Sequence, residues 1–395
     1  MSFFLTTIKD VSLGVYDGPH ATPKVSTSGH VFLGIKNVTS QGRLDLSKIK
    51  YVSKEEYSKW IIRVKPQCGD VVFSYEATLH RYAIIPKGFE GCLGRRMGLI
   101  RPDPKKINSR FLHYYFLSPQ WQKYADTKVI VGATVSRFSI KDFPDFLLNI
   151  PSLEIQKVIS TVLSQYDDLI ENNRRRIQLL EESARLLYKE WFVHLRFPGH
   201  EQVKVVDGVP EGWVKKNLFE VSRVTYGFSF KSTLFSGDAI GLPVVRIRNI
   251  PSRVSKVFTI EEAPEEKLLE NGDFLIGMDG DFHMNYWCGG KAWLNQRVVR
   301  VLGANGVSTG FVKQAIEKPI FDFNRVITGT TVRHLGAKHL KMIDFFIPDD
   351  DVLNKANDYF EDVRIQVVCL FQKIKKLEQA RDILLPRLMS GELVV

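Results

Sequence analysis

Residues 150–192 read IPSLEIQKVISTVLSQYDDLIENNRRRIQLLEESARLLYKEWF, and the organisation of the whole chain follows from this stretch. Its seam positions recur in alternating steps of three and four, with one extra four-residue step between Asn173 and Ile177. This pattern predicts a helix from Ser152 to about Trp191, on the order of 55 Å long, whose heptad seam carries one stutter. The predicted seam consists of Ile159, Val162, Tyr166, Leu169, Asn173, Ile177, Leu180, Ala184, Leu187 and Trp191.

The same pattern returns 197 residues downstream, where Ile347-Pro348-Asp349 repeats Ile150-Pro151-Ser152. Ser152 and Asp349 each stand before an apolar run, where a helix N-cap is expected, and Pro386 is expected to end the second helix. The second predicted seam consists of Ala356, Tyr359, Val363, Val367, Leu370, Ile374, Leu377, Arg381 and Leu384.

A long helix with so narrow an apolar seam needs a partner, and the other copy is the nearest one. Antiparallel pairing keeps the connections between the two helices short, so an antiparallel coiled coil is predicted. The alternative is that both are core helices inside larger domains. The polar Asn173 in the first seam either fixes the register or lies exposed at the stutter.

The segments between the helices are also repeated. GATVSRF at 132–138 matches GTTVRHL at 329–335 with the same offset of 197, and short apolar runs alternate there with Gly, Pro, Asn and Ser. These runs predict an α+β protein with two similar mixed α/β domains, separated by two long helices in an internal repeat. The expected boundaries are 1–150 and 193–348 for the domains, and 151–192 and 349–395 for the helices.

Charge is unevenly distributed along the chain. Residues 1–150 carry 22 Lys and Arg against 12 Asp and Glu, whereas residues 193–350 carry 20 against 18, and both helices are close to neutral. A basic lobe favours a polyanionic partner, although a basic surface also serves solubility alone. The four cysteines are scattered singly, and the start of the chain lacks the pattern of a signal peptide. We therefore expect a cytoplasmic protein with no membrane association.

Motifs of catalysis are missing from the sequence. There is no phosphate-binding P-loop, since Gly289-Gly290-Lys291 is followed by Ala292, and no histidine pair with metal-ligand spacing occurs. We predict no catalytic residue and no metal site. A nuclease or methyltransferase of unrecognised type stays open as an alternative, as does an adaptor that binds only proteins through its coiled coil.

The whole pattern resembles the DNA-specificity subunit of type I restriction–modification systems. The resemblance is carried by the stretch 150–192, by VPEGWVKKNLFEV at 209–221 and by LEQARDILLPRLMSGEL at 377–393. DGPHATPK at 17–24 and GDFLIGMDGDFHMNYWCGGKAWLNQRVVRV at 272–301 add to it, so the resemblance covers almost the whole chain.

The resemblance implies two target-recognition domains, each reading half of a split sequence in double-stranded DNA, with the helices as the ruler between them. It also implies docking of two modification (methyltransferase) subunits, and it leaves open whether a restriction motor–nuclease subunit joins them. The expected cofactors, S-adenosylmethionine, ATP and Mg, would then bind the partner subunits and not this chain.

Candidate DNA-binding residues come from loops that correspond in the two lobes. With an offset of 203, Glu76 maps onto Asp279 and His80 onto His283, and an acid there is suited to accept from cytosine N4. Arg96 and Arg297 occupy matching strands, and buried structural roles are an alternative for them. The candidates are Thr22, Lys24, Lys36, Glu76, Thr78, His80, Arg81, Arg96, Thr134, Arg137, Lys231, Arg246, Arg248, Asp279, His283, Asn285, Tyr286, Arg297, Thr331, Arg333 and His334.

Lys24 and Lys231 follow the glycine loops near the start of each lobe and are expected to grip phosphate. For Glu76 and His80, the alternative is that the acid and the histidine satisfy each other within a turn. Candidates for docking the partner subunits lie on the helices and at the end of the first one: Arg174, Arg175, Arg176, Trp191, Phe192, Lys375 and Lys376.

Overall fold

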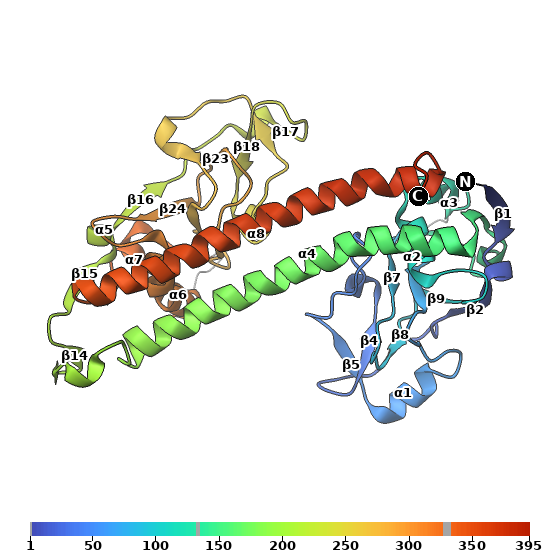
Figure 1. Ribbon diagram of the computed structural model, residues 1–395, viewed down its shortest axis with the longest axis horizontal. Helices are drawn as coiled ribbons and strands as arrows, with labels where there is room; N and C mark the ends of the chain where they lie inside the picture. The colour runs from blue at the N-terminus through green and yellow to red at the C-terminus, as the bar shows by residue number, and fades with distance from the viewer. Residues whose placement is uncertain (1, 132–134, 327–332) are drawn as a thin grey trace. The chain divides into compact units, whose positions relative to one another are not determined.

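The computed structural model describes residues 2–131, 135–326 and 333–395. The chain divides into two compact units (Figure 1). Unit 1 comprises Met1–Leu169 and Leu377–Val395, and unit 2 comprises Ile170–Lys376. Each unit therefore contains one lobe of the repeat and a part of both long helices.

The two long helices are α4 (Leu153–Tyr188) and α8 (Asp350–Ser390). Helix α4 runs from unit 1 into unit 2 and α8 runs back, so the two are antiparallel. The N-cap prediction for Asp349 is confirmed, because its Oδ1 accepts from the amides of Asp351 and Val352, both at 3.1 Å. For Ser152 the structure shows only its carbonyl accepting from the Gln156 amide, as at any first turn.

Pro386 does not end α8, contrary to the prediction. The helix continues for four residues to Ser390. A proline inside a helix removes the amide donor to the carbonyl four residues earlier, so some other interaction must hold the last turn. Leu388 and Met389 provide it, because both are buried in the core of unit 1.

The seam of α8 follows the prediction more closely than the seam of α4. In α8, Ala356, Val363, Val367, Leu370, Ile374 and Arg381 are buried as predicted. The predicted Tyr359 and Leu384 are half-buried next to the buried Phe360 and Leu385, and Leu377 is also half-buried. In α4 the fully buried row is Leu163, Ile170, Ile177 and Ala184.

This row in α4 corrects two predicted positions. Leu163 and Ile170 are buried where Val162 and Leu169 were expected, and Leu169 is 50% exposed. Because Leu163, Ile170 and Ile177 are spaced by seven, the seam needs no stutter. Two adjacent apolar residues in the sequence hid the regular register, and the half-buried Asn173 lies on the regular heptad.

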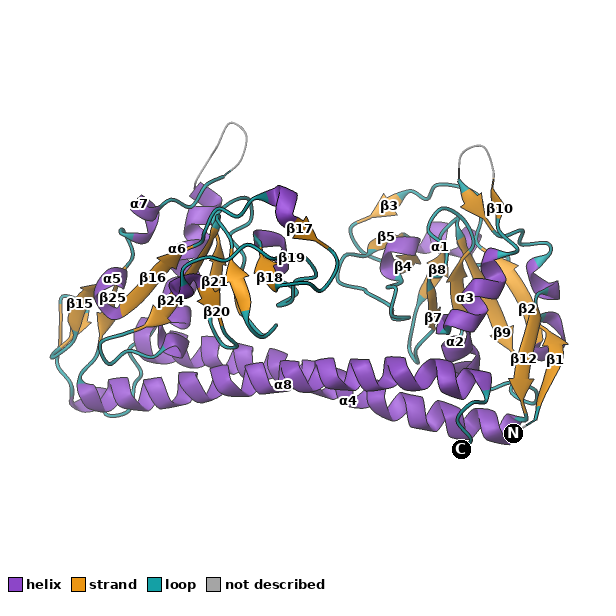
Figure 2. Ribbon diagram, turned by 90° about the horizontal axis from the view of Figure 1, so that it is seen from above, coloured by secondary structure: helices purple, strands orange, loops and turns teal. Residues whose placement is uncertain are grey.

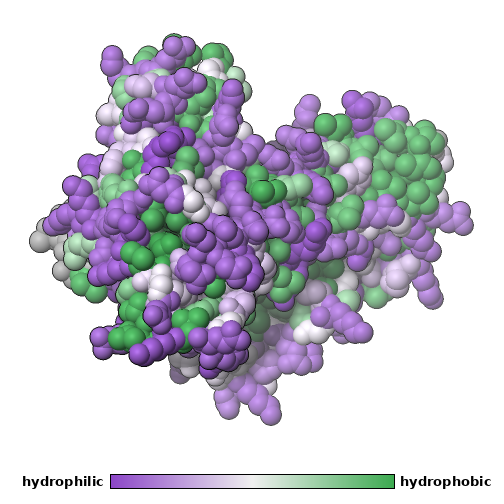
Figure 3. All heavy atoms as spheres, turned by 60° about the vertical axis from the view of Figure 1, so that its left-hand side comes forward, coloured by the Kyte–Doolittle hydropathy of each residue, from purple (hydrophilic) through white to green (hydrophobic). Residues whose placement is uncertain are grey.

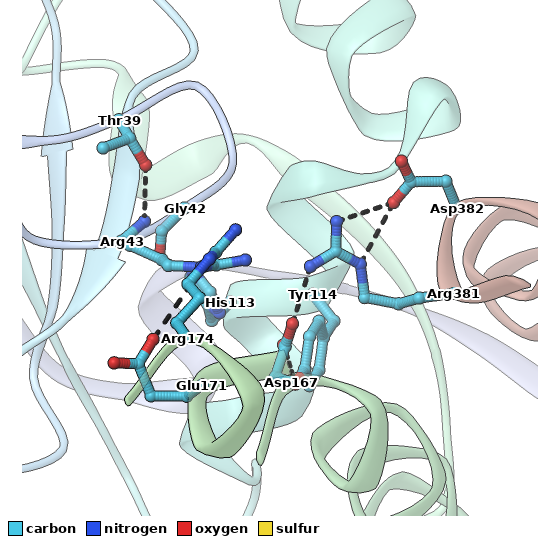
Figure 4. Close-up of polar contacts among 10 residues, drawn as sticks. All are labelled: Thr39, Gly42, Arg43, His113, Tyr114, Asp167, Glu171, Arg174, Arg381 and Asp382. Atoms are coloured by element: carbon cyan, nitrogen blue, oxygen red, sulfur yellow. Dashed lines mark hydrogen bonds and ion pairs between the residues drawn. The ribbon is translucent and has the colours of Figure 1, made fainter. Parts of the chain in front are cut away.

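One charged side chain occupies the seam within unit 1 (Figure 4). Arg381 is 8% exposed and donates from Nη1 to Asp167 Oδ1 at 2.6 Å and from Nη2 to Asp382 Oδ1 at 2.7 Å. The Tyr114 hydroxyl donates to the other oxygen of Asp167 at 2.6 Å. Burial opposes the charge on Arg381, but the hydrogen bonds to the two aspartates outweigh it and raise the pKa of Arg381.

Unit 1 contains two four-stranded sheets, in the orders β2-β9-β6-β7 and β3-β5-β4-β8. All neighbouring strands are antiparallel except β4 and β8, which are parallel. Helix α2 packs on β6 and β7, and its aromatic residues continue the core toward α4 and α8. The strands of the two sheets are β2 (Ser12–Asp17), β3 (Val25–Ser26), β4 (His30–Leu33), β5 (Lys50–Val52), β6 (Val71–Ser74), β7 (Tyr82–Ile84), β8 (Gly91–Leu93) and β9 (Met97–Pro102).

The remaining elements of unit 1 close its edges. Strand β1 pairs with β12 just before α4, and β10 pairs with β11. These elements and the helices are β1 (Phe3–Thr7), α1 (Lys54–Trp60), α2 (Ser109–Leu117), α3 (Pro119–Asp126), β10 (Ile130–Val131), β11 (Ser136–Arg137) and β12 (Leu147–Pro151).

Unit 2 repeats this plan with a second four-stranded sheet of the same order, β16-β24-β21-β22. Its other sheet has five strands in the order β17-β19-β18-β23-β20, again with one parallel pair, β18 and β23. The strands are β16 (Ser222–Tyr226), β17 (Phe235–Ser236), β18 (Leu242–Val245), β19 (Phe258–Thr259), β20 (Leu268–Leu269), β21 (Phe274–Gly277), β22 (Met284–Tyr286), β23 (Ala292–Leu294) and β24 (Val298–Gly303).

Helix α6 (Thr309–Val326) packs on β24, and β15 (Val214–Asn217) pairs with β25 (Asp344–Ile347) just before α8. The short elements are β13 (Val205–Val206), β14 (Val209–Pro210), α5 (Leu218–Val221) and α7 (Ala337–Leu340). The two units thus share strand order, the parallel pair and the closing strand pair. The predicted fold class, two similar mixed α/β domains with two long antiparallel helices, is confirmed.

Candidate nucleic-acid interface

The sheets β2-β9-β6-β7 of unit 1 and β16-β24-β21-β22 of unit 2 correspond to each other. In each of them, one end of the strands lies at the long helices and the other end lies away from them. Strand β21 begins beside Gly272, whose carbonyl accepts from Arg364 of α8 at 3.0 Å. Strand β6 begins after Gly69, which lies against Ser109, and the adjacent Asn108 is hydrogen bonded to Gln156 of α4. The strands therefore carry the following loop away from the helices, and Figure 2 draws β10 at that end of unit 1.

Three segments meet at this far end of unit 1: the loop after β6, the turn between β8 and β9, and β11. The Tyr75 amide donates to the Arg96 carbonyl at 3.2 Å, and the Ala77 amide donates to the Ser136 carbonyl at 3.0 Å. Glu76 forms an isolated β-bridge with Arg137. Among the side chains, Arg96 Nε lies 3.0 Å from Glu76 Oε1.

We call Glu76, Arg96 and Arg137 the first distal cluster. The side chain of Arg96 is 35% exposed and that of Glu76 is 22% exposed. This exposure of Arg96 favours the predicted contact with DNA over the alternative of a buried structural role. The Tyr75 hydroxyl donates to the Arg95 carbonyl at 2.6 Å and fixes the turn from behind. Burial raises the pKa of Tyr75 to about 12, so the hydroxyl keeps its proton.

Unit 2 repeats the same backbone bonds with different side chains. The Met278 amide donates to the Arg297 carbonyl at 2.8 Å, and the Gly280 amide donates to the Arg333 carbonyl at 3.0 Å. Asp279 forms a β-bridge with His334. Asp279 Oδ2 lies 3.6 Å from Arg297 Nε, and its Oδ1 lies 2.6 Å from His334 Nδ1.

We call Asp279, Arg297 and His334 the second distal cluster. The side chain of Arg297 is 56% exposed, more than that of Arg96, and the backbone φ of Arg297 is +71°. The residue equivalent to Tyr75 is Met278, which has no hydroxyl to hold the turn. The second cluster therefore keeps the backbone hydrogen bonds of the first but differs in its side-chain contacts, since Asp279 contacts both Arg297 and His334.

Both turns depend on a glycine that the sequence reading passed over. The Gly18 amide donates to the Met97 carbonyl and the Gly227 amide donates to the Val298 carbonyl, at 3.0 and 3.1 Å. A Cβ on Gly18 would lie 2.4 Å from the Gly94 carbonyl oxygen, and one on Gly227 would lie 1.9 Å from that of Asn295. No side chain fits at either place. The sequence signal was the glycine that follows β2 in unit 1 and β16 in unit 2.

The structure corrects the predicted match between His80 and His283. The Ser74 amide donates to Arg81 O, and the Gly277 amide donates to His283 O. The loop of unit 2 is one residue shorter, so His283 takes the place of Arg81. His80 contacts Asp126 of α3 at 2.8 Å and has a φ of +58°. The alternative in which Glu76 and His80 satisfy each other is therefore also wrong.

Tyr286 is wrong as a DNA-binding candidate, whereas Asn285 is half-buried and its role stays a prediction. Tyr286 is 2% exposed and packs against Phe274, so it belongs to the core. Asn285 lines a cavity of about 400 Å³ together with Glu181 of α4 and Arg253, on the helix side of unit 2.

The other candidates in the lobes lie mostly on the surface. Lys36 and Arg248 are equivalent, since Asn37 and Asn249 cap their two short turns by accepting from the amides of Gly34 and Arg246. Arg246 is half-buried, and burial, followed by the charge of Arg248, lowers its pKa. Thr22, Lys24, Lys36, Thr78, Arg137, Lys231, Arg248, His283 and Arg297 are exposed, and Arg81 is half-buried.

Arg333 is tied within unit 2, because Nη1 donates to Asn324 O at 2.6 Å and Nη2 to Asp281 Oδ1 at 3.1 Å. This arginine therefore connects the end of α6 to the loop after β21, which the sequence could not show. Thr134 and Thr331 lie outside the described residues. Their role stays a prediction.

The candidates for partner docking divide into two groups. Arg175 and Arg176 are exposed on α4 and Lys376 on α8, whereas Arg174 approaches Glu171 at 3.8 Å and Lys375 lies over the ring of Phe371. Trp191 and Phe192 are half-buried against Trp213 and Phe197, so they serve the packing of unit 2. Whether these two half-buried residues also dock a partner subunit stays a prediction.

The sequence reading missed apolar residues on the outer face of α4. Leu179 is 52% exposed and Leu186 47%, and Val158 on the same heptad row is 45% exposed. Figure 3 shows hydrophobic residues, in green, among hydrophilic ones on the face in view. The spacing of the three α4 residues, seven and twenty-one positions, was readable in the sequence, but the seam took precedence in its interpretation.

Within the described ranges, no group of three or more His, Cys, Asp and Glu side chains is arranged to hold a metal ion. No described helix is long and apolar enough to cross a membrane.

Known proteins resemble this chain over nearly its full length. The family described as Type I restriction modification DNA specificity domain matches residues 22–182. The MjaIX specificity subunit of a type I restriction enzyme from Methanocaldococcus jannaschii is 24% identical over 401 residues, or 96% of this chain and 87% of that protein. The EcoBI specificity subunit from Escherichia coli is 29% identical over 134 residues, which cover 34% of this chain and 28% of that one.

The fold is also known from a solved structure. The S subunit of a type I restriction–modification system from M. genitalium superposes with a TM-score of 0.60 at 14% sequence identity, covering 98% of this chain and 96% of that chain. This likeness concerns the fold, and it agrees with the duplicated units described above. The chain is therefore similar to DNA specificity subunits of type I restriction–modification enzymes, in sequence and in fold.

Proposed function

We propose that this chain reads a bipartite DNA sequence, one half with each unit, as the non-catalytic specificity subunit of a type I restriction–modification complex. The observation that carries the proposal is the duplicated distal cluster. Two lobes with different side chains keep the same backbone bonds around an acid and an arginine. A scaffold kept constant while its exposed side chains vary is what two readers of different half-sites require.

The proposal assigns chemistry to partners and recognition to this chain. Two modification subunits would bring S-adenosylmethionine and methylate adenine, and a restriction subunit with ATP and Mg would add translocation and cleavage. The exposed Leu179 and Leu186 on α4, beside Arg175 and Arg176, support docking on the helices, since exposed apolar rows with a polar rim mark interaction sites. DNA as substrate implies a cytoplasmic location.

The decisive experiment is methylome sequencing of cells that express this chain with its modification subunits. The expected result is one adenine-methylated motif with two specific parts and a non-specific gap, which disappears when this chain alone is deleted. A motif that persists after the deletion, or a purified chain that methylates or cuts DNA by itself, would refute the proposal.

A second experiment tests whether the paired helices set the gap between the half-sites. Seven residues inserted after both Ile177 and Ile374 preserve the heptad and lengthen each helix by about 10 Å, close to three base pairs at about 3.4 Å each. We expect the same two half-sites with a longer gap, and weaker binding because the added twist misaligns the second groove. A folded variant that keeps the original gap would show that the helices are not the ruler. An insertion of seven after Ile177 alone serves as the mismatched control.

A further inference from the structure

Resting on the proposed function, we propose that Arg96 and Arg297 each read a guanine, one in each half-site, and that Glu76 and Asp279 are positioning residues that orient them. The alternative, in which the acids themselves accept from cytosine, was the expectation from sequence. The contacts within the two distal clusters favour the arginines.

Each acid lies closest to the Nε of its arginine. Glu76 approaches Nε of Arg96 at 3.0 Å, and Asp279 approaches Nε of Arg297 at 3.6 Å. A guanidinium has five N–H donors in a fixed plane, so a carboxylate at Nε leaves the terminal Nη1 and Nη2 groups for another acceptor. Among the described residues, neither arginine donates a hydrogen bond from Nη1 or Nη2, and the closest contact of each acid is to Nε. Those two groups match the O6 and N7 acceptors of guanine in the major groove.

The arginine and acid side chains also differ in their exposure to solvent. In both clusters the arginine is more exposed than its acid, 35% against 22% in unit 1 and 56% against 27% in unit 2. The acid therefore lies behind the arginine relative to solvent. A carboxylate so placed also avoids the negative phosphates of the duplex, which would repel it at the surface.

Backbone hydrogen bonds fix the two turns that bear the arginines. Arg96 and Arg297 occupy the same place in two tight turns, closed by the amides of Met97 and Val298 on the carbonyls of Gly94 and Asn295. The Arg96 carbonyl accepts from the Tyr75 amide, and the Arg297 carbonyl accepts from the Met278 amide. Tyr75 and Met278 directly precede the two acids in the chain. The turn and the acid are thus fixed together, which holds a long side chain in one orientation.

The test measures base preference position by position, with the full chain and a library of duplexes that carry randomised half-sites. Arg96→Gln is expected to lose preference for guanine at one position of one half-site by about 10- to 100-fold, and Arg297→Gln at one position of the other. Glu76→Gln is expected to weaken the same guanine preference as Arg96→Gln by a smaller factor, without creating a new preferred base. Arg95→Gln, in the same exposed turn, is the matched control and is expected to leave every preference in place.

Arg96→Lys resolves the case in which Arg96→Gln does not fold. Lysine keeps the charge but not the planar pair of donors, so guanine preference should fall while binding to random DNA stays within about twofold. The inference is overturned if both arginine variants keep every base preference, or if Glu76→Gln abolishes a preference for cytosine that Arg96→Gln leaves intact. A wild-type chain with no base preference at all would instead refute the proposed function.

Discussion

The two distal clusters share a backbone but differ in how firmly each holds its arginine. In unit 1, Glu76 contacts Arg96, and the Tyr75 hydroxyl fixes the turn through the Arg95 carbonyl. In unit 2, Asp279 divides its oxygens between Arg297 and His334, and Met278 contributes no hydrogen bond to the turn from its side chain. The repeat therefore preserves the frame that positions a reader, while the contacts that tune it have diverged.

Glycine substitutions test the shared frame and should have the largest effect. Gly227→Ala places a Cβ 1.9 Å from the Asn295 carbonyl oxygen, so the turn that bears Arg297 must move, at a cost on the order of 3 kcal/mol. We expect unit 2 to lose its half-site, measured as binding to duplexes that carry only that half. A Cβ at position 18 would lie 2.4 Å from the Gly94 carbonyl oxygen, so Gly18→Ala should damage unit 1 less. The alanine at exposed Gly237, which has open space around it, is the control.

The polar contact in the helix seam distinguishes unit 1 from unit 2, where the aligned residue is the buried Ala184. Arg381→Ala leaves Asp167 and Tyr114 without their cation and should lower the free energy of unfolding by about 2–3 kcal/mol. Chemical denaturation followed by circular dichroism measures the change. Arg387→Ala, at an exposed position of the same helix, should alter it by less than about 0.5 kcal/mol. Equal effects of the two variants would contradict a stabilising role for Arg381.

Acid should destabilise unit 1 through His113, whose counterpart in unit 2 is Lys313. His113 is buried and contacts the Gly42 carbonyl at 2.9 Å, and burial lowers its pKa from 6.5 to about 4. The unfolded chain therefore takes up a proton first. The stabilisation is complete above pH 6.5 and is lost as the pH falls toward 4, by about 2 kcal/mol at pH 5.

His113→Gln removes this titration. The unfolding free energy of that variant should vary less with pH between 6.5 and 4 than that of the wild type. Chemical denaturation at pH 7 and pH 5 gives the comparison. An unchanged pH dependence in the variant would assign the acid sensitivity to other groups.

Tyr75→Phe makes the first turn resemble the second, because only the hydroxyl bond to the Arg95 carbonyl is lost. The net contribution of one such bond is about 1 kcal/mol, so affinity for the first half-site should fall by about fivefold. Binding to duplexes with one half-site each would show the loss in unit 1 only. A fall in both half-sites would mean that Tyr75 supports the fold as a whole.

The smallest effects belong to the lysines that precede β3 and β17. Lys24→Ala and Lys231→Ala should each weaken binding to every DNA sequence by about two- to fivefold and reduce the salt slope by about one. Titrations at several salt concentrations measure both quantities. A change in base preference at constant salt slope would show base contact instead of phosphate contact.

The sequence by itself determined the duplication, the two helices and the fold class. A repeat with a constant offset and a period-seven pattern survives in one dimension, because helix geometry ties apolar spacing to a buried face. It also placed Glu76 with Asp279 and Arg96 with Arg297, since these matches need only the offset between two aligned strands. Whether these residues touch DNA stays a prediction.

Tertiary structure decided what the offset could not. The loop shorter by one residue moved His283 to the place of Arg81, and adjacent apolar residues left the choice between Leu169 and Ile170 to packing. Tyr286 lies in the core because other elements cover its strand, and a strand's own sequence does not show what covers it. Which nitrogen of an arginine an acid holds is set by three segments far apart in the chain, and such convergence leaves no local trace in the sequence.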